Sequence, residues 1–246
     1  MKALIERLLI SKNILVLTGA GISADTGIPT FRGKDGIWHK VDITQLATPT
    51  AFKNNPQKVW DFYRARREKC FATEPGISHL TLVELENLLS ADITIITQNV
   101  DGLHIRAGSK NVIEIHGSLS KDRCNSCGYK QDTTLTSELC FCPKCDELMR
   151  PDIVWFEEQL DWDKLEISQE LSKNCDTMFV IGTSALVYPS AGFPIIAKQG
   201  DAFLVEINPE ETPLTRYCDM VFRENSSNAL EQIVNKLKQS LKGDKK

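Results

Sequence analysis

Short apolar runs recur along the chain and are rich in β-branched side chains. Nearly continuous apolar runs of this length are typical of strands that are buried on both faces of a sheet. Two patterns with helical spacing, HLTLVELENLL (79–89) and NALEQIVNKLKQSL (228–241), also occur. Because strands alternate with helices, the sequence predicts an α/β fold with a doubly wound parallel sheet. The predicted strands are ILVLT (14–18), ITIIT (93–97), VIEI (112–115), MFVIG (178–182), FLVEI (203–207) and MVF (220–222).

Two stretches interrupt this alternation. Residues 35–71 are rich in aromatic and charged side chains, and residues 119–157 hold five of the eight cysteines. We expect these stretches to form a smaller domain, a helical module plus a zinc ribbon, that is inserted into the sheet domain. The sheet domain would then comprise residues 1–34, 72–118 and 158–246.

The composition is that of a soluble globular protein, because 41% of the 246 residues are apolar and 25% are charged. The net charge of -4 provides no diffuse attraction to nucleic acid or to an anionic membrane, so neither is expected as a partner. Glu6, Arg7 and Lys12 interrupt the apolar residues at the N-terminus, which fits neither a secretory signal nor a membrane span. We therefore expect a cytoplasmic protein.

The cysteines are spaced as metal ligands. Two C-x-x-C pairs, CNSC (124–127) and CPKC (142–145), have 14 residues between their inner cysteines. This spacing is close to that of zinc ribbons, in which two turns each supply two thiolates to a closed tetrahedral site. A closed site leaves no open position for a substrate, so we expect one Zn²⁺ ion with a structural role. The expected ligands are Cys124, Cys127, Cys142 and Cys145.

The other cysteines have no such spacing. Cys140 lies two residues before Cys142 and could replace it as a ligand, but Pro143 suits the turn of the 142–145 pair. Three scattered cysteines are expected to be buried as small apolar side chains: Cys70, Cys175 and Cys218.

A glycine-rich turn follows the first predicted strand. In ILVLTGAGISADTG, Gly19, Gly21 and Ala24 match the G-x-G-x-x-A pattern of dinucleotide-binding loops. Small residues there let the backbone approach a pyrophosphate at a helix N-terminus, although a tight turn without a ligand explains the glycines equally well. An ordinary dehydrogenase is disfavoured, because the second strand and its ribose-binding acid about 20 residues on are absent. Phe31 and Arg32 could cover a nicotinamide ribose, or Phe31 could pack in the core.

Polar side chains follow two of the predicted strands. Gln98, Asn99 and Asp101 come after the run that ends at residue 97, and His116 follows VIEI. Doubly wound folds bind ligands at the carboxyl ends of their strands, so we expect these side chains to line one crevice. A lone histidine is more often structural, but Gly117 beside it and this polar setting favour a functional His116.

Two further strand ends fit the same crevice. GTSALVYP (182–189) is small and hydroxylated, which suits phosphate or ribose, and Asn208 in EINPEE (206–211) could meet a ribose hydroxyl. Either segment could be an ordinary turn. The agreement of four strand ends favours a ligand site.

Motifs that together resemble the sirtuin family cover nearly the whole chain: GAGISADTGIPTFRG, TQNVDGLH, IEIHGS, the two C-x-x-C pairs and GTSALVYP. The resemblance implies a Rossmann-like domain with a zinc module, and NAD-dependent removal of acyl groups from protein lysines with release of nicotinamide and O-acyl-ADP-ribose. It implies that His116 is the general base for a ribose hydroxyl, which suits an unperturbed pKa of about 6.5. The residues that it assigns to NAD are Gly19, Ala20, Gly21, Ile22, Asp25, Phe31, Arg32, Gln98, Asn99, Asp101, Gly182, Thr183, Ser184 and Asn208.

The resemblance also concerns the acyl group. The segment VWDFYRARREKC carries Tyr63 and Arg66 on one helix face, and it resembles the sirtuin branch that removes succinyl, malonyl and glutaryl groups. In that branch a Tyr-x-x-Arg pair binds the acyl carboxylate, and a small residue, here Ala47, widens the acyl pocket. Val154 and Phe156 would line the substrate site. We therefore expect acetyl-lysine to be a poor substrate.

Three alternatives stay open at this point. Arg64, Arg66 and Arg67 could simply form a solvated basic face of a helix. The same NAD cleavage could serve a mono-ADP-ribosyltransferase that modifies a protein nucleophile. The chain could also be a catalytically silent, NAD-sensing protein that uses its zinc ribbon to bind partners.

One position departs from the family pattern. Glu157 in PDIVWFEEQL stands where sirtuins usually have the glycine of Phe-Gly-Glu. The substrate peptide is expected to pair there through backbone hydrogen bonds. Because glycine allows close approach or positive φ, the glutamate leaves peptide affinity and sequence preference open.

Overall fold

The computed structural model describes residues 1–30 and 42–243, so the predicted site residues Phe31 and Arg32 lie outside the described residues. Its centre is a six-stranded sheet with the order β3-β2-β1-β7-β8-β9, in which all neighbouring strands are parallel. Every strand that an apolar run predicts is present, so the α/β fold class is confirmed. The strands are β1 (Asn13–Thr18), β2 (Asp92–Thr97), β3 (Val112–Glu114), β7 (Thr177–Ile181), β8 (Phe203–Ile207) and β9 (Met220–Phe222).

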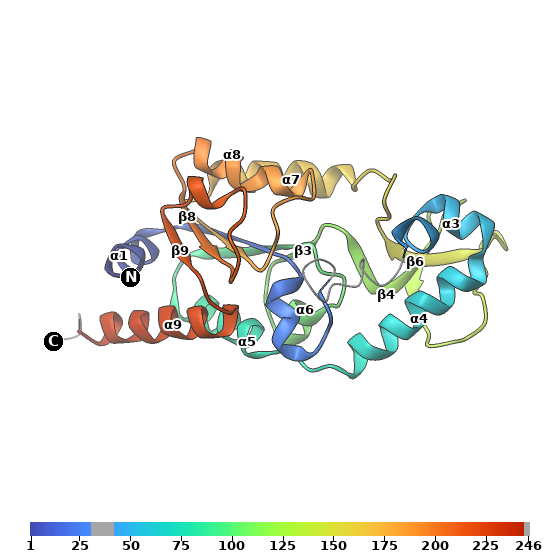
Figure 1. Ribbon diagram of the computed structural model, residues 1–246, viewed down its shortest axis with the longest axis horizontal. Coiled ribbons are helices and arrows are strands. Elements are labelled where there is room, and N and C mark those ends of the chain that lie inside the picture. The colour runs from blue at the N-terminus through green and yellow to red at the C-terminus, as the bar shows by residue number, and fades with distance from the viewer. Residues whose placement is uncertain (31–41, 244–246) are drawn as a thin grey trace.

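Helices cover both faces of this sheet (Figure 1). α1 (Lys2–Ile10), α5 (Ile77–Leu88) and α9 (Ser226–Gly243) share one apolar core with the sheet, and α7 (Trp162–Asn174) and α8 (Phe193–Gln199) share another on the opposite face. The apolar patterns at 79–89 and 228–241 correspond to α5 and α9. Over the described part of the chain, no helix has both the length and the apolar character that a membrane crossing requires.

β1 shows why the apolar runs are nearly continuous. Ile14 and Val16 pack in the core with α1, α5 and α9, whereas Leu15 and Leu17 pack in the core with α7 and α8. Successive side chains of a strand point to opposite faces, so a sheet that is covered on both faces needs apolar residues at every position.

A second, smaller sheet lies beyond the edge of the first, at the right of Figure 1. It is three-stranded and antiparallel, with β4 (Gly117–Cys124) between β5 (Lys130–Asp132) and β6 (Met149–Ile153). α3 (Pro49–Asn54) and α4 (Pro56–Ala72) pack near it. These two helices and the small sheet share a core that includes Phe52, Val59, Tyr63, Leu119, Ile153 and Trp155. The two-domain division with the boundaries given above stays a prediction.

A buried ion pair attaches α4 to β4. Arg67 Nη2 donates to Asp122 Oδ1 at 2.5 Å, and Arg67 Nε donates to the carbonyl of Leu119 at 2.9 Å. The Arg67 and Asp122 side chains are 2% and 1% exposed, so removal of either partner would leave a buried charge unpaired, at a cost of about 3 to 5 kcal/mol. The pair therefore fixes the helix that carries Tyr63 and Arg66 against the small sheet.

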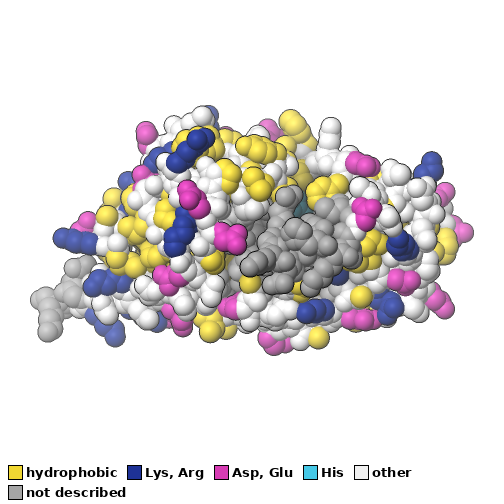
Figure 2. Space-filling model, in the orientation of Figure 1, with side chains coloured by type: hydrophobic (Ala, Val, Ile, Leu, Met, Phe, Trp, Pro, Cys, Tyr) yellow, Lys and Arg dark blue, Asp and Glu magenta, His cyan; other side chains and the backbone are white. Residues whose placement is uncertain are grey.

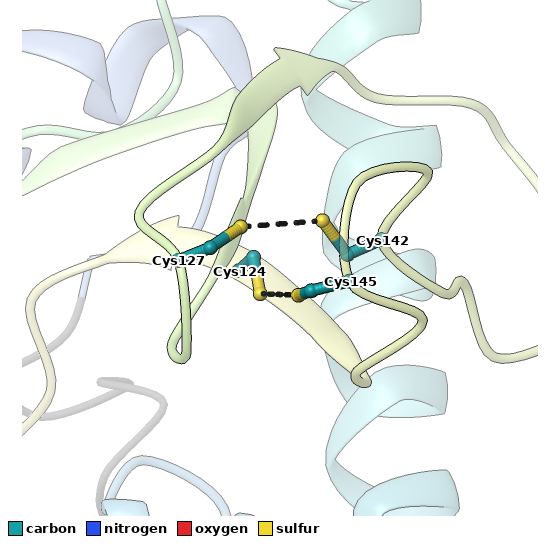
Figure 3. A group of neighbouring side chains, drawn as sticks. All are labelled: Cys124, Cys127, Cys142 and Cys145. Carbon is teal, nitrogen blue, oxygen red and sulfur yellow. Dashed lines mark hydrogen bonds between the residues drawn. The ribbon is translucent and has the colours of Figure 1, made fainter.

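The four predicted zinc ligands converge at one end of this sheet (Figure 3). Their Sγ atoms lie within 4.8 Å of one another, and the Cys124–Cys145 and Cys127–Cys142 Sγ distances are both 3.5 Å. A disulfide would require about 2.05 Å. Thiolates around a tetrahedral Zn²⁺ with Zn–S bonds of about 2.3 Å lie about 3.8 Å apart, so the set fits a structural zinc ion.

Each C-x-x-C turn closes in the same way. The amide of Gly128 donates to the carbonyl of Cys124, the amide of Asp146 donates to the carbonyl of Cys142, and both Gly128 and Asp146 have positive φ. Cys140 lies outside the set, with its Sγ bound by Gln131 Nε2 at 3.3 Å. Of the scattered cysteines, Cys70 and Cys175 are buried as expected, and Cys218 is half-buried.

Glu157 has a backbone conformation that glycine adopts more easily than a residue with a side chain. Its φ is +74°, in the left-handed region, where a residue with a Cβ is strained by about 1 kcal/mol. The flanking backbone holds it there, because the amide of Phe156 donates to the carbonyl of Ala47 at 3.0 Å. The glutamate therefore combines a left-handed backbone with an exposed carboxylate.

Replacement of Cys142 by serine should remove the bound zinc and destabilise the small sheet. Four-thiolate sites contribute roughly 10 to 16 kcal/mol of binding free energy in zinc-finger peptides, so loss of one ligand should lower the melting temperature markedly. Elemental analysis and a thermal melt measure both effects. Cys140→Ser is the matched control and should keep one zinc per chain. Full zinc content in Cys142→Ser, or zinc loss in Cys140→Ser, would overturn this assignment of ligands.

Glu157→Gly should change the free energy of unfolding by less than about 0.6 kcal/mol, because relief of about 1 kcal/mol of strain at positive φ offsets the roughly 0.4 to 1 kcal/mol of entropy that glycine adds to the unfolded chain. Urea unfolding measures the change. Gln159→Gly is the control, since Gln159 is also exposed but has no positive φ, and it should lower stability by about 0.4 to 1 kcal/mol. Equal destabilisation by the two substitutions would show that Glu157 is not strained.

Candidate active site

A cavity of about 1120 Å³ opens at the carboxyl ends of β1, β2, β7 and β8 and extends to α4 and the segment after β6. Figure 2 shows Lys, Arg, Asp and Glu side chains interspersed over the face of the molecule that it draws. The cavity shows that the predicted crevice at the strand ends is present. Its walls include these predicted site residues: Gly19, Ala20, Gly21, Ala47, Tyr63, Arg66, Gln98, Asn99, His116, Val154, Phe156, Gly182, Thr183, Ser184 and Asn208.

The loops that follow β1 and β7 touch through their glycines. The amide of Gly21 donates to the carbonyl of Gly182 at 2.8 Å, and a Cβ on Gly21 would lie 2.6 Å from the Cα of Gly182. A Cβ on Gly19 would lie 2.8 Å from the carbonyl oxygen of Gly182. The glycine pattern thus has a cause within the chain, namely close packing of two strand-end loops.

The segment after the glycine turn is helical but is not an α-helix. It is a seven-residue 3₁₀ helix, η1 (Ala20–Thr26), and Gly27 at φ +79° ends it. Thr26 Oγ1 donates back to the carbonyl of Ser23 at 2.7 Å in the last turn. Two predicted nucleotide contacts on this helix lie off the cavity: Ile22 is fully buried, and Asp25 is exposed beside Gly76.

Asp101 also lies away from the main cavity wall. Its carboxylate accepts from Ser23 Oγ at 2.9 Å and from the amide of Leu103 at 3.0 Å, behind the glycine turn. Asn99 Nδ2 donates to the carbonyl of Gly19 at 3.2 Å, which ties the end of β2 to the same turn. These side chains therefore fix the shape of the glycine loop, while Asn99 also reaches the cavity.

His116 is held in one tautomer. Its Nδ1 lies 3.1 Å from the carbonyl oxygen of Gln98, and because a carbonyl can only accept, Nδ1 carries the proton and Nε2 carries the lone pair. Burial lowers the pKa of His116, and the hydrogen bond to Gln98 offsets part of that effect. The ring is therefore neutral at pH 7 and can accept a proton at Nε2.

The backbone beside His116 is equally constrained. Gly117 has φ +84°, and a Cβ there would lie 2.0 Å from the carbonyl oxygen of Asp152. The carbonyl of His116 accepts from the amide of Val154 at 2.9 Å. His104, another histidine near the strand ends, is buried against Thr18, and burial lowers its pKa to about 3. Of the histidines in residues 1–30 and 42–243, His116 lines the cavity wall and His104 does not.

Gln98 carries a donor that no described residue satisfies. Its Oε1 accepts from Thr183 Oγ1 at 3.3 Å, but its Nε2 is buried and has no hydrogen-bond partner among the described residues. Because Gln98 lines the cavity, this amide can donate to an acceptor oxygen of a ligand. Asn208 is different, since its Nδ2 donates to the carbonyl of Thr183 at 2.9 Å and its Oδ1 accepts from Glu210.

The opposite wall of the cavity carries Tyr63 and Arg66 from α4. Tyr63 is 4% exposed, and burial raises its pKa to about 12, so its hydroxyl stays neutral at pH 7. Burial lowers the pKa of the Arg66 guanidinium, which still carries its charge at neutral pH. Ala47 is buried on the same part of the wall.

The three neighbouring arginines of α4 have three different environments. Arg64 lies at the surface and donates to Glu68 at 2.7 Å, Arg67 is buried with Asp122, and Arg66 lines the cavity. The alternative that all three arginines form one solvated basic face therefore does not hold; only Arg64 lies on such a face. The spacing of α4 at 3.6 residues per turn separates the three side chains.

Several residues of the wall were not identified from the sequence. Trp155 lies between two predicted substrate-site residues and is buried, and Trp162 and Tyr188 are 72% and 76% exposed at the cavity. Trp155 and Trp162 stand in PDIVWFEEQLDW, where two tryptophans within a polar, acidic stretch are the one available signal. The four zinc ligands do not line the cavity, which fits a structural metal.

Known proteins resemble the chain over most of its length. The sequence model of the Sir2 family matches residues 19–189. An NAD-dependent protein deacylase of Aquifex aeolicus (strain VF5) is 47% identical over 230 residues, which cover 92% of this chain and 96% of that protein. An NAD-dependent protein deacylase of Pyrococcus abyssi (strain GE5 / Orsay) is 42% identical over 241 residues, which cover 94% and 95%.

Solved structures agree with these sequence matches. A mutant Sir2 homologue in complex with ADP ribose has a TM-score of 0.93 and 42% identity, and the match covers 98% of each chain. A Sir2 homologue in complex with NAD has a TM-score of 0.91 and 42% identity, over 98% of this chain and 95% of that one. The resemblance to the sirtuins is thereby confirmed, and the chain belongs to the Sir2 family.

Proposed function

We propose that this chain is an NAD-dependent protein lysine deacylase that prefers succinyl, malonyl and glutaryl groups over acetyl. The observation that carries the proposal is the position of His116 and of the Tyr63–Arg66 pair on the walls of one cavity. Relatives named as NAD-dependent protein deacylases support the reaction class. Structural neighbours in complex with NAD and with ADP ribose support NAD as the cofactor.

The strand-end wall of the cavity suits the nucleotide. Gln98 offers a buried amide donor that no described residue satisfies, and Thr183 and Ser184 add hydroxyl groups. These side chains, with Gly19, Ala20, Gly21, Asn99, Gly182 and Asn208, would hold NAD. Bound NAD supplies the glycosidic bond to nicotinamide and the ribose that receives the acyl group.

His116 suits the role of general base. Its Nε2 lone pair is available because Nδ1–H donates to the carbonyl of Gln98. That same hydrogen bond stabilises the imidazolium once Nε2 has accepted a proton, and it keeps the ring in one orientation. Gly117 contributes by allowing the backbone turn that places the ring at the cavity.

The α4 wall suits an acyl chain that ends in a carboxylate. Arg66 supplies a permanent positive charge and planar donors, which match the two oxygens of a carboxylate. Tyr63 supplies a neutral hydroxyl beside it, and the small side chain of Ala47 leaves room for a longer acyl group. The substrates of the proposed reaction are therefore acylated lysine side chains of proteins.

Addition of NAD and a succinyl-lysine peptide should release nicotinamide, and His116→Ala should lower that rate by about 1000-fold, as expected for loss of a general base. Because burial disfavours the imidazolium, kcat/KM should be retained above the lowered pKa and lost as pH falls through it, with a midpoint below about 6.5. Chromatography of nicotinamide across pH measures both. An unchanged rate in His116→Ala, or label from NAD retained covalently on protein, would contradict a deacylase.

Arg66→Met should lower kcat/KM for the succinyl-lysine peptide by about 100-fold, because it removes the charge that pairs with the acyl carboxylate. The rate on the acetyl version of the same peptide should change by less than about threefold, since that acyl group carries no charge. Arg64→Met is the matched control, because Arg64 lies on the same helix at the surface. A succinyl-to-acetyl ratio that is the same in Arg66→Met and wild type would refute the acyl preference.

A further inference from the structure

The hydroxyl of Tyr63 is engaged by Trp155. The indole Nε1 of Trp155 lies 2.9 Å from Tyr63 Oη, and the two side chains are 92 residues apart in the sequence. An indole N–H can only donate, so the hydrogen bond runs from Trp155 to Tyr63 and uses a lone pair of the phenol oxygen. The proton of Tyr63 must therefore point elsewhere.

The Tyr63 hydroxyl has no hydrogen-bond acceptor among the described residues, so its proton can point into the cavity. Among the described residues, no acceptor is recorded for Tyr63 Oη, and the residue lines the cavity although it is 4% exposed. A phenol that accepts a hydrogen bond also becomes a better donor, because the two bonds polarise one another. Tyr63 thus presents a donor next to the positive charge of Arg66, a combination that matches an oxyanion.

Trp155 is itself fixed from two sides. The guanidinium carbon of Arg150 lies 3.2 Å from the centre of the Trp155 ring, and Phe52 packs at a centroid distance of 5.3 Å. The backbone amide of Trp155 donates to Glu158 Oε2 at 2.8 Å. The indole N–H is therefore held in one direction before any ligand binds.

Arg150 and Glu158 complete this support. The Arg150 side chain is 0% exposed and donates to both Glu158 oxygens, at 2.5 and 3.0 Å, and to the carbonyl of Ile153. A buried bidentate pair of this kind has little freedom to rearrange. The rigid unit extends from the end of β6 to Tyr63 on α4.

We propose that Trp155 is a positioning residue that orients the Tyr63 hydroxyl as a donor toward an anionic acyl tail, and so contributes to selection of dicarboxylic acyl-lysines. The inference rests on the proposed function and deepens it. Loss of the indole N–H leaves the phenol free to turn its lone pairs to the cavity, where they repel a carboxylate. The effect falls on binding of the acyl tail and spares the chemical step at His116.

Trp155→Phe tests this, because it keeps an aromatic ring under Arg150 and removes the N–H. It should lower kcat/KM for the succinyl-lysine peptide by about tenfold through KM, with kcat and the acetyl-lysine rate within about twofold of wild type. Tyr63→Phe should also lower kcat/KM for the succinyl-lysine peptide through KM, because it removes the hydroxyl itself. Because both act through one hydroxyl, the double variant should be no worse than the lower of the two single variants.

Two controls separate a positioning role from loosened packing. Phe52→Leu removes another aromatic contact of Trp155 without touching the hydrogen bond, and should leave the succinyl-to-acetyl ratio unchanged. The indole N–H resonance of Trp155 should also differ between the wild-type protein and Tyr63→Phe, because the substitution removes the acceptor of its hydrogen bond. This NMR readout requires no activity and no ligand.

The outcomes distinguish the two proposals. A wild-type enzyme without a succinyl preference overturns the acyl assignment and, with it, the role of Trp155. A wild-type enzyme with that preference, combined with a Trp155→Phe variant that lowers both substrates equally, overturns the role of Trp155 alone. An indole resonance that does not respond to Tyr63→Phe overturns it as well, whatever the rates.

Discussion

Backbone contact between two glycine loops is the constraint on which the cavity depends. Gly21 and Gly182 approach so closely that no Cβ fits, and this contact fixes the ends of β1 and β7 side by side. Asn99 ties the end of β2 to the same place through the carbonyl of Gly19. The strand ends thus form one rigid wall, and the donors on that wall are preorganised for a ligand.

His116 lies where the chain leaves the large sheet and enters the small one. β3 ends at Glu114 and β4 begins at Gly117, so both sheets determine where the ring lies. The amide of Val154, just after β6, binds the carbonyl of His116. The small sheet, which the cysteine cluster stabilises, therefore supports the proposed base on one side and Trp155 on the other. This connection explains how a metal outside the cavity can matter for the site.

Local and long-range features differed in how far the sequence could predict them. The strands were predictable because each run serves two cores, as Ile14 and Leu15 do, and the cysteine set because each pair is a local turn. The separate environments of Arg64 and Arg67, and the bond from Trp155 to Tyr63, depend on packing between distant segments, which spacing along the chain does not encode. The bond of Asp101 to Ser23 Oγ is likewise a contact between distant segments; Asp101 lines a small pocket that shares Ala20, Arg66 and Asn99 with the main cavity, and its contact with a nucleotide stays a prediction.

The central claim is that a neutral His116, protonated at Nδ1, turns the lone pair of Nε2 to the cavity at the strand ends. Nitrogen NMR of the ring, assigned with His116→Ala, measures the tautomer directly at pH 7, before and after addition of NAD. The account predicts a proton on Nδ1 and a shift of the Nε2 signal when NAD is added. A proton on Nε2, or an Nε2 signal that does not respond to NAD, would contradict it.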